Sequence, residues 1–436
     1  MNMRTGVLLG WAMASGCGGA SSSGDPTLVY LEGGEPRAGA PVLVSTLLGE
    51  TLFETETDAD GAVILDLSDA ALVTVGRTPA ATLFNLDFLT LEPDDEIFSR
   101  LVEPGQSVTV GSTVPAIDAS RVGVLLPSFA EDAGAAELYE MRNGFGFMNS
   151  SDFEGLSTPI PVPAAAVEDG SMTLLAWAVD FDLRKTAYVV VDVDLAPFAQ
   201  GATEVPVEMP SWQEDLAEIP VSMTGLSDLW VSADTTLWRD GKRYLLGTDY
   251  GHTPGSPLPD TVDVSVQVPP DFADTLEIAG FNSSDLAPHW LSAAERTPAA
   301  PDSVDLDIGG TAPPGCNGIQ LDLADSGLVR VAWDGGGGSE DAVDLSVTNL
   351  AIDATATRWH LVLPPGTSEI TLPTLPAALA PSQIDPDAGV EAFVHHTDLS
   401  TADGYDAYLD ALTAGGFDTA SPGDTRLDGA CGGPLN

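Results

Sequence analysis

Short apolar runs separated by turn residues are the dominant pattern along the chain. The clearest runs cover residues 121–126, 173–182, 186–193, 262–268, 328–333, 359–363 and 390–394. They are rich in β-branched and aromatic residues, are bounded by Pro and Gly, and show no dominant helical period. Runs of this length and spacing are typical of sandwiches. We therefore predict an all-β protein made of several β-sandwich domains in tandem.

Two Asp-Gly pairs mark candidate hairpin turns, because Asp-Gly supports the positive φ that tight turns need. Asp240-Gly241 lies between the apolar-polar segments 237–239 and 242–245. Asp60-Gly61 lies between segments 51–57 and 62–67. The sequence predicts that each pair of segments forms an antiparallel hairpin.

Three similar proline phrases close apolar segments, at residues 205–210, 264–269 and 370–373. Since proline stops edge strands, we interpret these phrases as the ends of repeated β units. One helix is expected near the C-terminus. Tyr405, Tyr408, Leu409 and Leu412 share one helical face, and Gly415-Gly416 can end the helix.

The first β-rich segment has a familiar pattern. The phrase from Gly34 to Val42 (GEPRAGAPV), the phrase from Thr57 to Gly61 (TDADG) and a strand ending at Val75 follow one another. Together they resemble the carboxypeptidase-regulatory-like, transthyretin-like β-sandwich over about residues 27–110. The resemblance implies a structural or adhesive module attached to other domains. Together with the small residues that lead to Cys17, which resemble a bacterial lipobox, and with the β-rich remainder, this module is similar to surface lipoproteins of myxobacteria.

Acidic residues are spread over the whole chain. Sixty-six Asp and Glu against 15 Lys and Arg give a net charge of −51, and only Lys185 and Lys242 are lysines. Such a surface repels phosphate backbones, which excludes nucleic acid as a partner. Every part of the chain after the first 24 residues shares the excess of acidic over basic residues. The negative charge therefore indicates a solvated surface, or a surface that binds divalent cations weakly, and not an acidic tail.

The N-terminus has the pattern of an export signal. Arg4 precedes an apolar stretch from Gly6 to Ala14, and small residues lead to Cys17. This arrangement resembles a bacterial lipobox, in which Cys17 would be lipidated and become the first residue of the mature chain. Residues 18–24 are Gly, Ala and Ser and form a flexible tether. The alternative is an ordinary cleaved signal with an incidental cysteine.

Two further cysteines, Cys316 and Cys431, form an even pair in an exported chain and predict a disulfide. The loop that it would close contributes about 4–5 kcal/mol to stability through chain entropy. Two buried free thiols are the alternative.

Proline-rich passages place domain boundaries near residues 115, 215 and 300. The expected order is a signal peptide (1–16), a lipidated tether (17–26), the carboxypeptidase-regulatory-like sandwich (27–115), a second sandwich (116–215), a β-rich domain (216–300) and a sandwich with the C-terminal helix (301–436).

Motifs for catalysis are missing from the sequence. There is no G-x-S-x-G elbow, no phosphate-binding glycine loop and no H-E-x-x-H pattern, and we expect no catalytic residues and no metal site. His395 and His396 precede Asp398, but neighbouring strand residues point to opposite faces, so only one histidine could join the acid. Asp58 and Asp60 offer two carboxylates, fewer ligands than a calcium loop needs. No cofactor is expected beyond a weak possibility of calcium.

Basic and aromatic residues offer candidate contacts. Arg239, Lys242 and Arg243 gather at one hairpin tip, where they either contact an anionic partner or protect an edge strand by charge. Seven tryptophans follow the signal: Trp177, Trp212, Trp230, Trp238, Trp290, Trp333 and Trp359. We expect them in sandwich cores; exposed, they would stack on sugars.

These patterns predict an exported, outer-membrane lipoprotein, on the periplasmic or the cell-surface side, with a binding, adhesive or structural role. Its membrane contact would be the lipid anchor alone, with a protein or a polysaccharide as partner. A carbohydrate-binding or carbohydrate-active protein that uses Trp and carboxylates is the alternative, and a calcium-stabilised scaffold is a third possibility.

Overall fold

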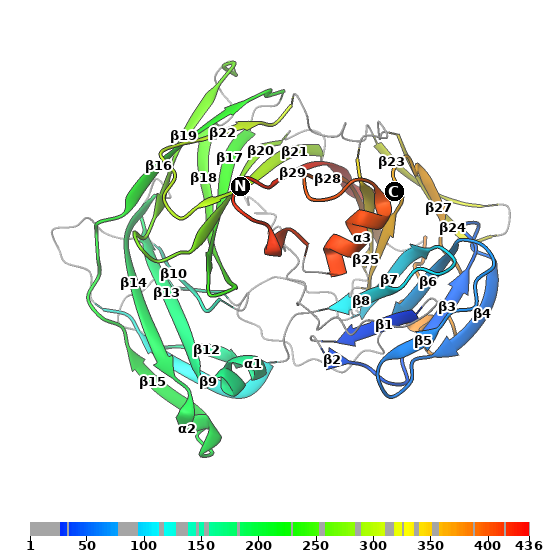
Figure 1. Cartoon of the computed structure of the whole chain (residues 1–436), viewed down its shortest axis with the longest axis horizontal. Coiled ribbons are helices and arrows are strands. Elements are labelled where there is room, and N and C mark those ends of the chain that lie inside the picture. The colour runs from blue at the N-terminus through cyan, green and yellow to red at the C-terminus, as the bar shows by residue number, and fades with distance from the viewer. Residues whose placement is uncertain are drawn as a thin grey trace. The chain divides into compact units, whose positions relative to one another are not determined.

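The computed structural model describes residues 27–32, 35–76, 95–112, 117–127, 138–144, 148–151, 157–180, 184–227, 230–252, 258–283, 289–309, 318–324, 327–334, 340–350, 357–386, 389–413 and 416–435. These residues form an all-β protein of several packed sheets with three short α-helices (Figure 1). The predicted fold class is confirmed.

The chain divides into two compact units that do not follow chain order. Unit 1 contains residues 1–114, 316–420 and 432–436, and unit 2 contains residues 115–315 and 421–431. Each unit joins segments far apart in the sequence, so strand pairing across long loops defines it.

The N-terminal sandwich of unit 1 has two sheets. One consists of β1 (Thr27–Glu32), β2 (Glu35–Pro36), β5 (Ala62–Ile64) and β8 (Val108–Ser112), with β5 and β8 on opposite sides of β1. The other has the order β4-β3-β6-β7 and contains β3 (Pro41–Ser45), β4 (Thr51–Glu56), β6 (Ala71–Gly76) and β7 (Asp95–Val102). Tyr30 from the first sheet packs against Phe98 from the second, with ring centroids 6.4 Å apart.

The predicted hairpin at Asp60-Gly61 is wrong. β4 pairs with β3, whereas β5 pairs with β1, so the chain crosses from one sheet to the other at this turn. Oδ1 of Asp58 accepts the backbone N–H groups of Asp60 and Ala62 and holds the turn. Gly61 has φ +67°, and a Cβ there would lie 2.8 Å from the carbonyl oxygen of Tyr30. The Asp-Gly signal therefore reports a tight turn, and the packing of the two sheets decides which strands it connects.

The C-terminal part of unit 1 continues the second sheet of the N-terminal sandwich. β25 (Ala342–Leu350), β26 (Thr357–Leu363) and β28 (Gly389–Leu399) extend it in the order β7-β26-β25-β28. β7 and β26 pair in parallel, from Asp95 with Thr357 onward. A separate three-stranded sheet contains β23 (Gly318–Leu323), β24 (Val329–Asp334) and β27 (Glu369–Thr371), and a 3-10 turn covers Ala380–Ser382. Unit 1 is thus two sandwiches that share one sheet.

The predicted C-terminal helix is confirmed as α3 (Tyr405–Thr413), followed by a 3-10 turn at Gly416–Thr419. Tyr408 and Leu409 are buried. The hydroxyl of Tyr405 donates toward the carbonyl oxygens of Leu101 and Val362, at 3.2 and 2.9 Å. Since those two carbonyls belong to β7 and β26, the helix covers the place where the two sandwiches of unit 1 join.

Unit 2 begins with a sandwich over residues 117–209. Its sheets are β12-β9-β15 and β11-β10-β13-β14. The strands are β9 (Ile117–Leu125), β10 (Leu138–Arg142), β11 (Met148–Ser151), β12 (Ser157–Pro163), β13 (Ser171–Val179), β14 (Lys185–Asp194) and β15 (Glu204–Glu208). Two helices that the sequence did not predict, α1 (Ala164–Asp169) and α2 (Ala196–Ala199), lie in connections and are too short to show a helical period.

The second part of unit 2 contains the sheets β19-β16-β22 and β18-β17-β20-β21-β29. Its strands are β16 (Ala217–Thr224), β17 (Trp230–Arg239), β18 (Lys242–His252), β19 (Val262–Val268), β20 (Thr275–Ser283), β21 (His289–Pro298), β22 (Val304–Asp307) and β29 (Thr425–Leu435). The hairpin prediction at Asp240-Gly241 is confirmed: both residues have positive φ, 51° and 70°, and β17 pairs with β18. β29 returns from the end of the chain to pair with β21.

The two parts of unit 2 pack through both faces of β13. Leu174, Ala176 and Ala178 belong to the core of the first sandwich. Leu175, Trp177 and Val179 belong to the core of the second. Because successive side chains of a strand point to opposite faces, one strand serves both cores. The three proline phrases cover the ends of β15, β19 and β27, each an outer strand of its three-stranded sheet, and that they mark repeated β units stays a prediction.

Candidate functional site

A buried charged pair of unit 2 lies where its two sandwiches meet. Lys185 is the first residue of β14, and Asp249 lies near the end of β18. Nζ of Lys185 donates to both carboxylate oxygens of Asp249, at 3.1 and 3.0 Å. Only 4% of the Lys185 side chain and 9% of the Asp249 side chain are exposed. Burial raises the pKa of the Asp249 carboxyl, and the charge of Lys185 opposes that shift.

A second acid lies beside this pair. Asp234 of β17 accepts a hydrogen bond from the hydroxyl of Thr248, the residue before Asp249. Burial raises the pKa of Asp234; Thr248 and the charge of Lys185 lower it, and the charge of Asp249 raises it. The charges of Lys185, Asp249 and Asp234 therefore act on one another in a shielded environment.

The same junction contains a buried arginine. The Arg142 guanidinium of β10 donates from Nε to the carbonyl oxygen of Leu245 at 2.9 Å and lies 5.2 Å from the Trp177 ring centroid. Burial lowers its pKa to about 10, and Glu140 acts in the opposite direction. Gly144 has φ +73°, and a Cβ at this position would lie 2.6 Å from the Tyr244 ring. Only glycine lets the backbone approach that ring so closely.

A further charged cluster lies on one face of the β20-β21-β29 part of unit 2. Glu277 lies 3.8 Å from Arg296 and 3.7 Å from Arg426, and Arg426 donates to Asp428 at 2.8 Å. The Arg296 guanidinium also lies 4.2 Å from the Trp238 ring centroid. The contacts join two acids and two arginines in alternation, from Arg296 through Glu277 and Arg426 to Asp428, so their charges compensate one another.

The predicted basic hairpin tip is largely neutralised by its surroundings. Lys242 pairs with Asp169 at 3.2 Å, and Arg239 lies 3.8 Å from Asp240 and 5.1 Å from the Phe272 ring centroid. The backbone N–H of Arg243 donates to the carbonyl of Gly144. A contact of these residues with an anionic partner stays a prediction.

Four of the seven tryptophans are buried, as expected for residues of sandwich cores. Trp177, Trp238, Trp333 and Trp359 are buried. Trp212, Trp230 and Trp290 are half-buried. Trp212 stacks on Tyr139 with centroids 5.6 Å apart and donates from Nε1 to the carbonyl of Pro127. Trp359 donates to the hydroxyl of Ser99 at 2.8 Å.

Histidines of unit 1 are enclosed. His360 stacks on Phe98 with ring centroids 5.8 Å apart, and burial lowers its pKa well below the usual value, aided by the charges of Arg358 and Arg100. His396 is buried, with Nδ1 3.6 Å from Oε1 of Glu340. Its neighbour His395 is only half-buried, which agrees with the prediction that the two point to opposite faces.

Metal-ligand geometry is missing from the described part of the chain, in which no three His, Cys, Asp or Glu side chains gather around one point. Asp58 and Asp60, which offer fewer carboxylates than a calcium loop needs, belong to the turn between β4 and β5, where Oδ1 of Asp58 accepts two backbone N–H groups. Of the cysteines, Cys431 is buried on β29. Cys17 and Cys316 lie outside the described residues.

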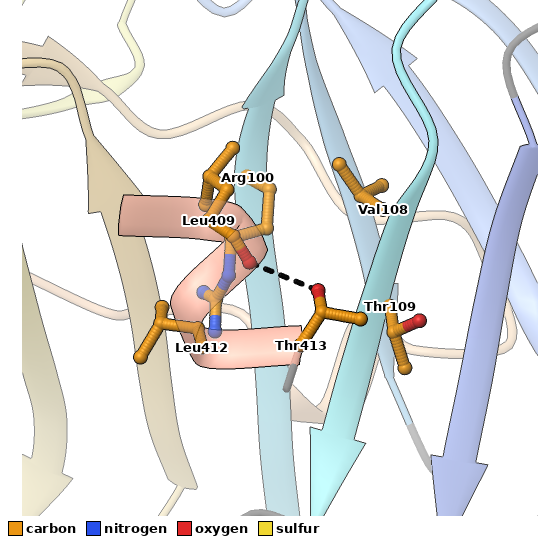
Figure 2. Close-up of a pocket in the computed structure, with 6 residues that line it drawn as sticks. All are labelled: Arg100, Val108, Thr109, Leu409, Leu412 and Thr413. Carbon is orange, nitrogen blue, oxygen red and sulfur yellow. Dashed lines mark hydrogen bonds between the residues drawn. The ribbon is translucent and has the colours of Figure 1, made fainter. Parts of the chain in front are cut away.

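A small cavity in unit 1 lies between α3 and the N-terminal sandwich (Figure 2). Its lining comes from Arg100 of β7, Val108 and Thr109 of β8, and Leu409, Leu412 and Thr413 of α3. The volume is about 10 Å³, which is room for about one water molecule. This cavity does not admit an organic substrate.

Sequence reasoning missed the Lys185–Asp249 pair and the Glu277–Arg296–Arg426 cluster. In so acidic a chain, carboxylates carry no signal of their own. The scarcity of lysine is the one signal that singles out Lys185. Among the described residues, no helix is both long enough and apolar enough to span a membrane.

Comparisons with known proteins leave the family open. No family model matches the chain, and no curated protein matches it. One similar solved structure is described as "The Bacillus anthracis TIE protein"; it is 10% identical, with a TM-score of 0.16, over 65% of this chain and 49% of that chain. The chain thus covers about half of the length of that protein, and a likeness this low supports no argument about function.

Proposed function

We propose that the chain is an exported lipoprotein of the outer membrane with a non-catalytic binding, adhesive or structural role. The observation that carries the proposal is the placement of the chemistry-bearing side chains. Lys185 with Asp249, Arg296 with Glu277, and His396 with Glu340 are all buried within the units. In such places they stabilise packing and do not meet a substrate.

Anchoring through Cys17 rests on the sequence. Cys17 follows an apolar stretch and small residues, and residues 18–24 provide slack before the first strand at Thr27. Gly18 follows the cysteine where an Asp would resemble a signal for retention in the inner membrane, which favours the outer membrane.

Metabolic labelling with a fatty-acid analogue tests the anchor. Wild-type chain should incorporate the label and Cys17→Ala should not, while both should fold alike because Cys17 precedes the sandwiches. If neither the wild-type chain nor Cys17→Ala incorporates the label, the proposed lipid anchor is wrong.

The Cys316–Cys431 disulfide is part of the same proposal, because export supplies an oxidising compartment. The buried position of Cys431 supports it. Alkylation in denaturant without reductant should modify neither cysteine of the exported chain, and prior reduction should expose both. Modification of both before reduction would indicate free thiols.

Carbohydrate binding is a second candidate, supported by an aromatic row in unit 2. Trp230, Ser283 and Trp290 lie in register across β17, β20 and β21, and Phe281 meets Trp290 edge to face at 5.9 Å. Half-buried aromatic rings on neighbouring strands are suited to stacking against sugar rings.

Titration of envelope polysaccharides against the folded chain, followed by tryptophan fluorescence, tests this candidate. Trp290→Ala should abolish a saturable response, and the matched control Trp212→Ala, in the other sandwich, should keep it. Absence of any saturable response in the wild type would favour the structural or adhesive role.

A further inference from the structure

The two lysines of the chain occupy opposite environments. Lys242 pairs with Asp169 at the surface, whereas Lys185 is buried. Every other basic residue is Arg, and the other buried cations among the described residues are Arg100, Arg142 and Arg296. Arg is the usual choice for a buried ion pair, because its planar guanidinium binds carboxylates bidentately. A lysine in this place offers instead a primary amine, which is a nucleophile once it is neutral.

The geometry of the pair is that of two reactants held in contact. Nζ lies at nearly equal distances from the two oxygens of Asp249, 3.1 and 3.0 Å, so the amine is held against the carboxyl group that it would attack. Across the ladders, Lys185 pairs with Val179, and Asp249 pairs with Ala233. Val179 and Ala233 both belong to the hydrophobic core of the second sandwich. Contact and exclusion of water are the conditions that make an intramolecular condensation fast.

Burial also favours the neutral form of the acid that such a reaction needs. Separate ions in an apolar interior cost desolvation energy, and transfer of one proton within the pair produces a neutral amine and a neutral acid. The pKa of Asp249 is raised by burial, and so is the pKa of the neighbouring Asp234. With two carboxyls and one ammonium sharing the site, an amide would remove two of these charges permanently.

We infer that Lys185 and Asp249 condense to an intramolecular isopeptide bond that joins β14 to β18 and so clamps the two sandwiches of unit 2. The ammonium first gives a proton to the carboxylate. The lone pair of Nζ then forms a bond to Cγ, and the π electrons of the carboxyl move to its oxygen. Collapse of this intermediate restores the carbonyl and breaks the other C–O bond. The leaving oxygen departs as water with one proton from the carboxyl and one from Nζ, so no oxidant, reductant or co-reactant is consumed.

Intact mass spectrometry of the folded, full-length chain tests the inference. After reduction and denaturation, the mass should be lower than the sequence mass of the processed chain by one water, about 18 Da. Reductive methylation in the same denaturant should label Lys242 and leave Lys185 unmodified, because denaturant opens an ion pair but not an amide. A mass without this loss, together with labelling of both lysines, would reduce the pair to an ordinary ion pair and overturn the inference.

Two variants locate the bond. Lys242→Arg should retain the loss of one water and leave no side-chain amine to label. Lys185→Arg keeps the positive charge against Asp249 but provides no lysine amine, so it should have the full sequence mass. If Lys185→Arg still lost one water, the bond would lie elsewhere and the assignment to Lys185 would be wrong. None of these outcomes depends on the lipid anchor or on the proposed role at the cell envelope.

Discussion

The two units join their sandwiches in different ways. In unit 1 the junction is edge to edge: β7 and β26 pair in parallel, and the side chains at the seam are mostly apolar or hydrogen-bonded, as in the bond from Trp359 to Ser99. In unit 2 the junction is face to face, through the second face of β13 and the charged pair of Lys185 with Asp249. The first junction depends mainly on backbone pairing and packing, with Arg100 of β7 as a buried charge at the seam, whereas the second holds an acid and a base in direct contact. The difference indicates that the two units respond differently to mutation and to pH.

The largest effect is expected at the seam of unit 1. Trp359→Ala removes a fully buried indole and its hydrogen bond to Ser99, and should lower the free energy of unfolding by about 4 kcal/mol. Urea unfolding of the full chain measures this. Trp359→Phe keeps most of the apolar area and should lose clearly less. Equal losses for both variants would mean that the hydrogen bond, and not packing, dominates the seam.

A slightly smaller loss is expected at the junction of unit 2. Lys185→Met leaves Asp249 buried without a counter-charge and should cost about 3 kcal/mol. The double variant Lys185→Met with Asp249→Leu removes both charged groups and should recover the part of this loss that the unpaired carboxylate causes, as measured by urea unfolding, while the contribution of the bond between the two strands stays lost. A double variant no more stable than the single one would show that something other than the unpaired carboxylate causes the loss.

The buried histidines make unit 1 sensitive to acid. Burial lowers the pKa of His360 and of His396 in the folded chain, so below the usual value of 6.5 the unfolded chain takes up protons that the folded chain does not. Unfolding then binds protons, and stability falls as the pH drops below about 6.5. Thermal melting between pH 7 and 5 should show Tm falling by a few °C, and His360→Gln should reduce the slope. A slope unchanged in His360→Gln would contradict a role for this imidazole.

The smallest effect is expected at the surface lysine. Lys242→Ala breaks the partly exposed pair with Asp169 and should change the free energy of unfolding by less than about 0.5 kcal/mol. The same urea experiment as for Lys185→Met makes the two lysines directly comparable. Similar losses for both would contradict the distinction between the junction and the hairpin tip.

Local signals in the sequence predicted the elements better than their partners. The short apolar run that forms β19 and the Asp-Gly turn between β17 and β18 depend on neighbouring residues, and both were predicted. The Asp-Gly turn before β5 looked the same locally, yet its flanking strands lie in different sheets. Which strands pair with each other depends on which apolar faces meet across the core. A short window of sequence does not contain that information.

The residues of the candidate site were even harder to predict from local sequence than the strand partners. Lys185 and Asp249 are 64 residues apart, and each alone looks like an ordinary charged residue of a strand. The scarcity of lysine could single out the first, but nothing singles out one aspartate among so many. Similarly, β29 reaches β21 from the far end of the chain, which brings Arg426 to Glu277.

By itself, the sequence determined the class of this protein: short apolar runs bounded by turn residues favour strands, proline ends the outer strands, and an excess of acid requires a solvated surface. Those properties depend on residue type and local spacing. Only the tertiary structure decided that the C-terminal segment contributes to both units, that β13 serves two cores, and that one of two lysines is buried against an acid. These features result from long-range strand pairing, in which the burial of whole faces selects partners that the local pattern leaves open.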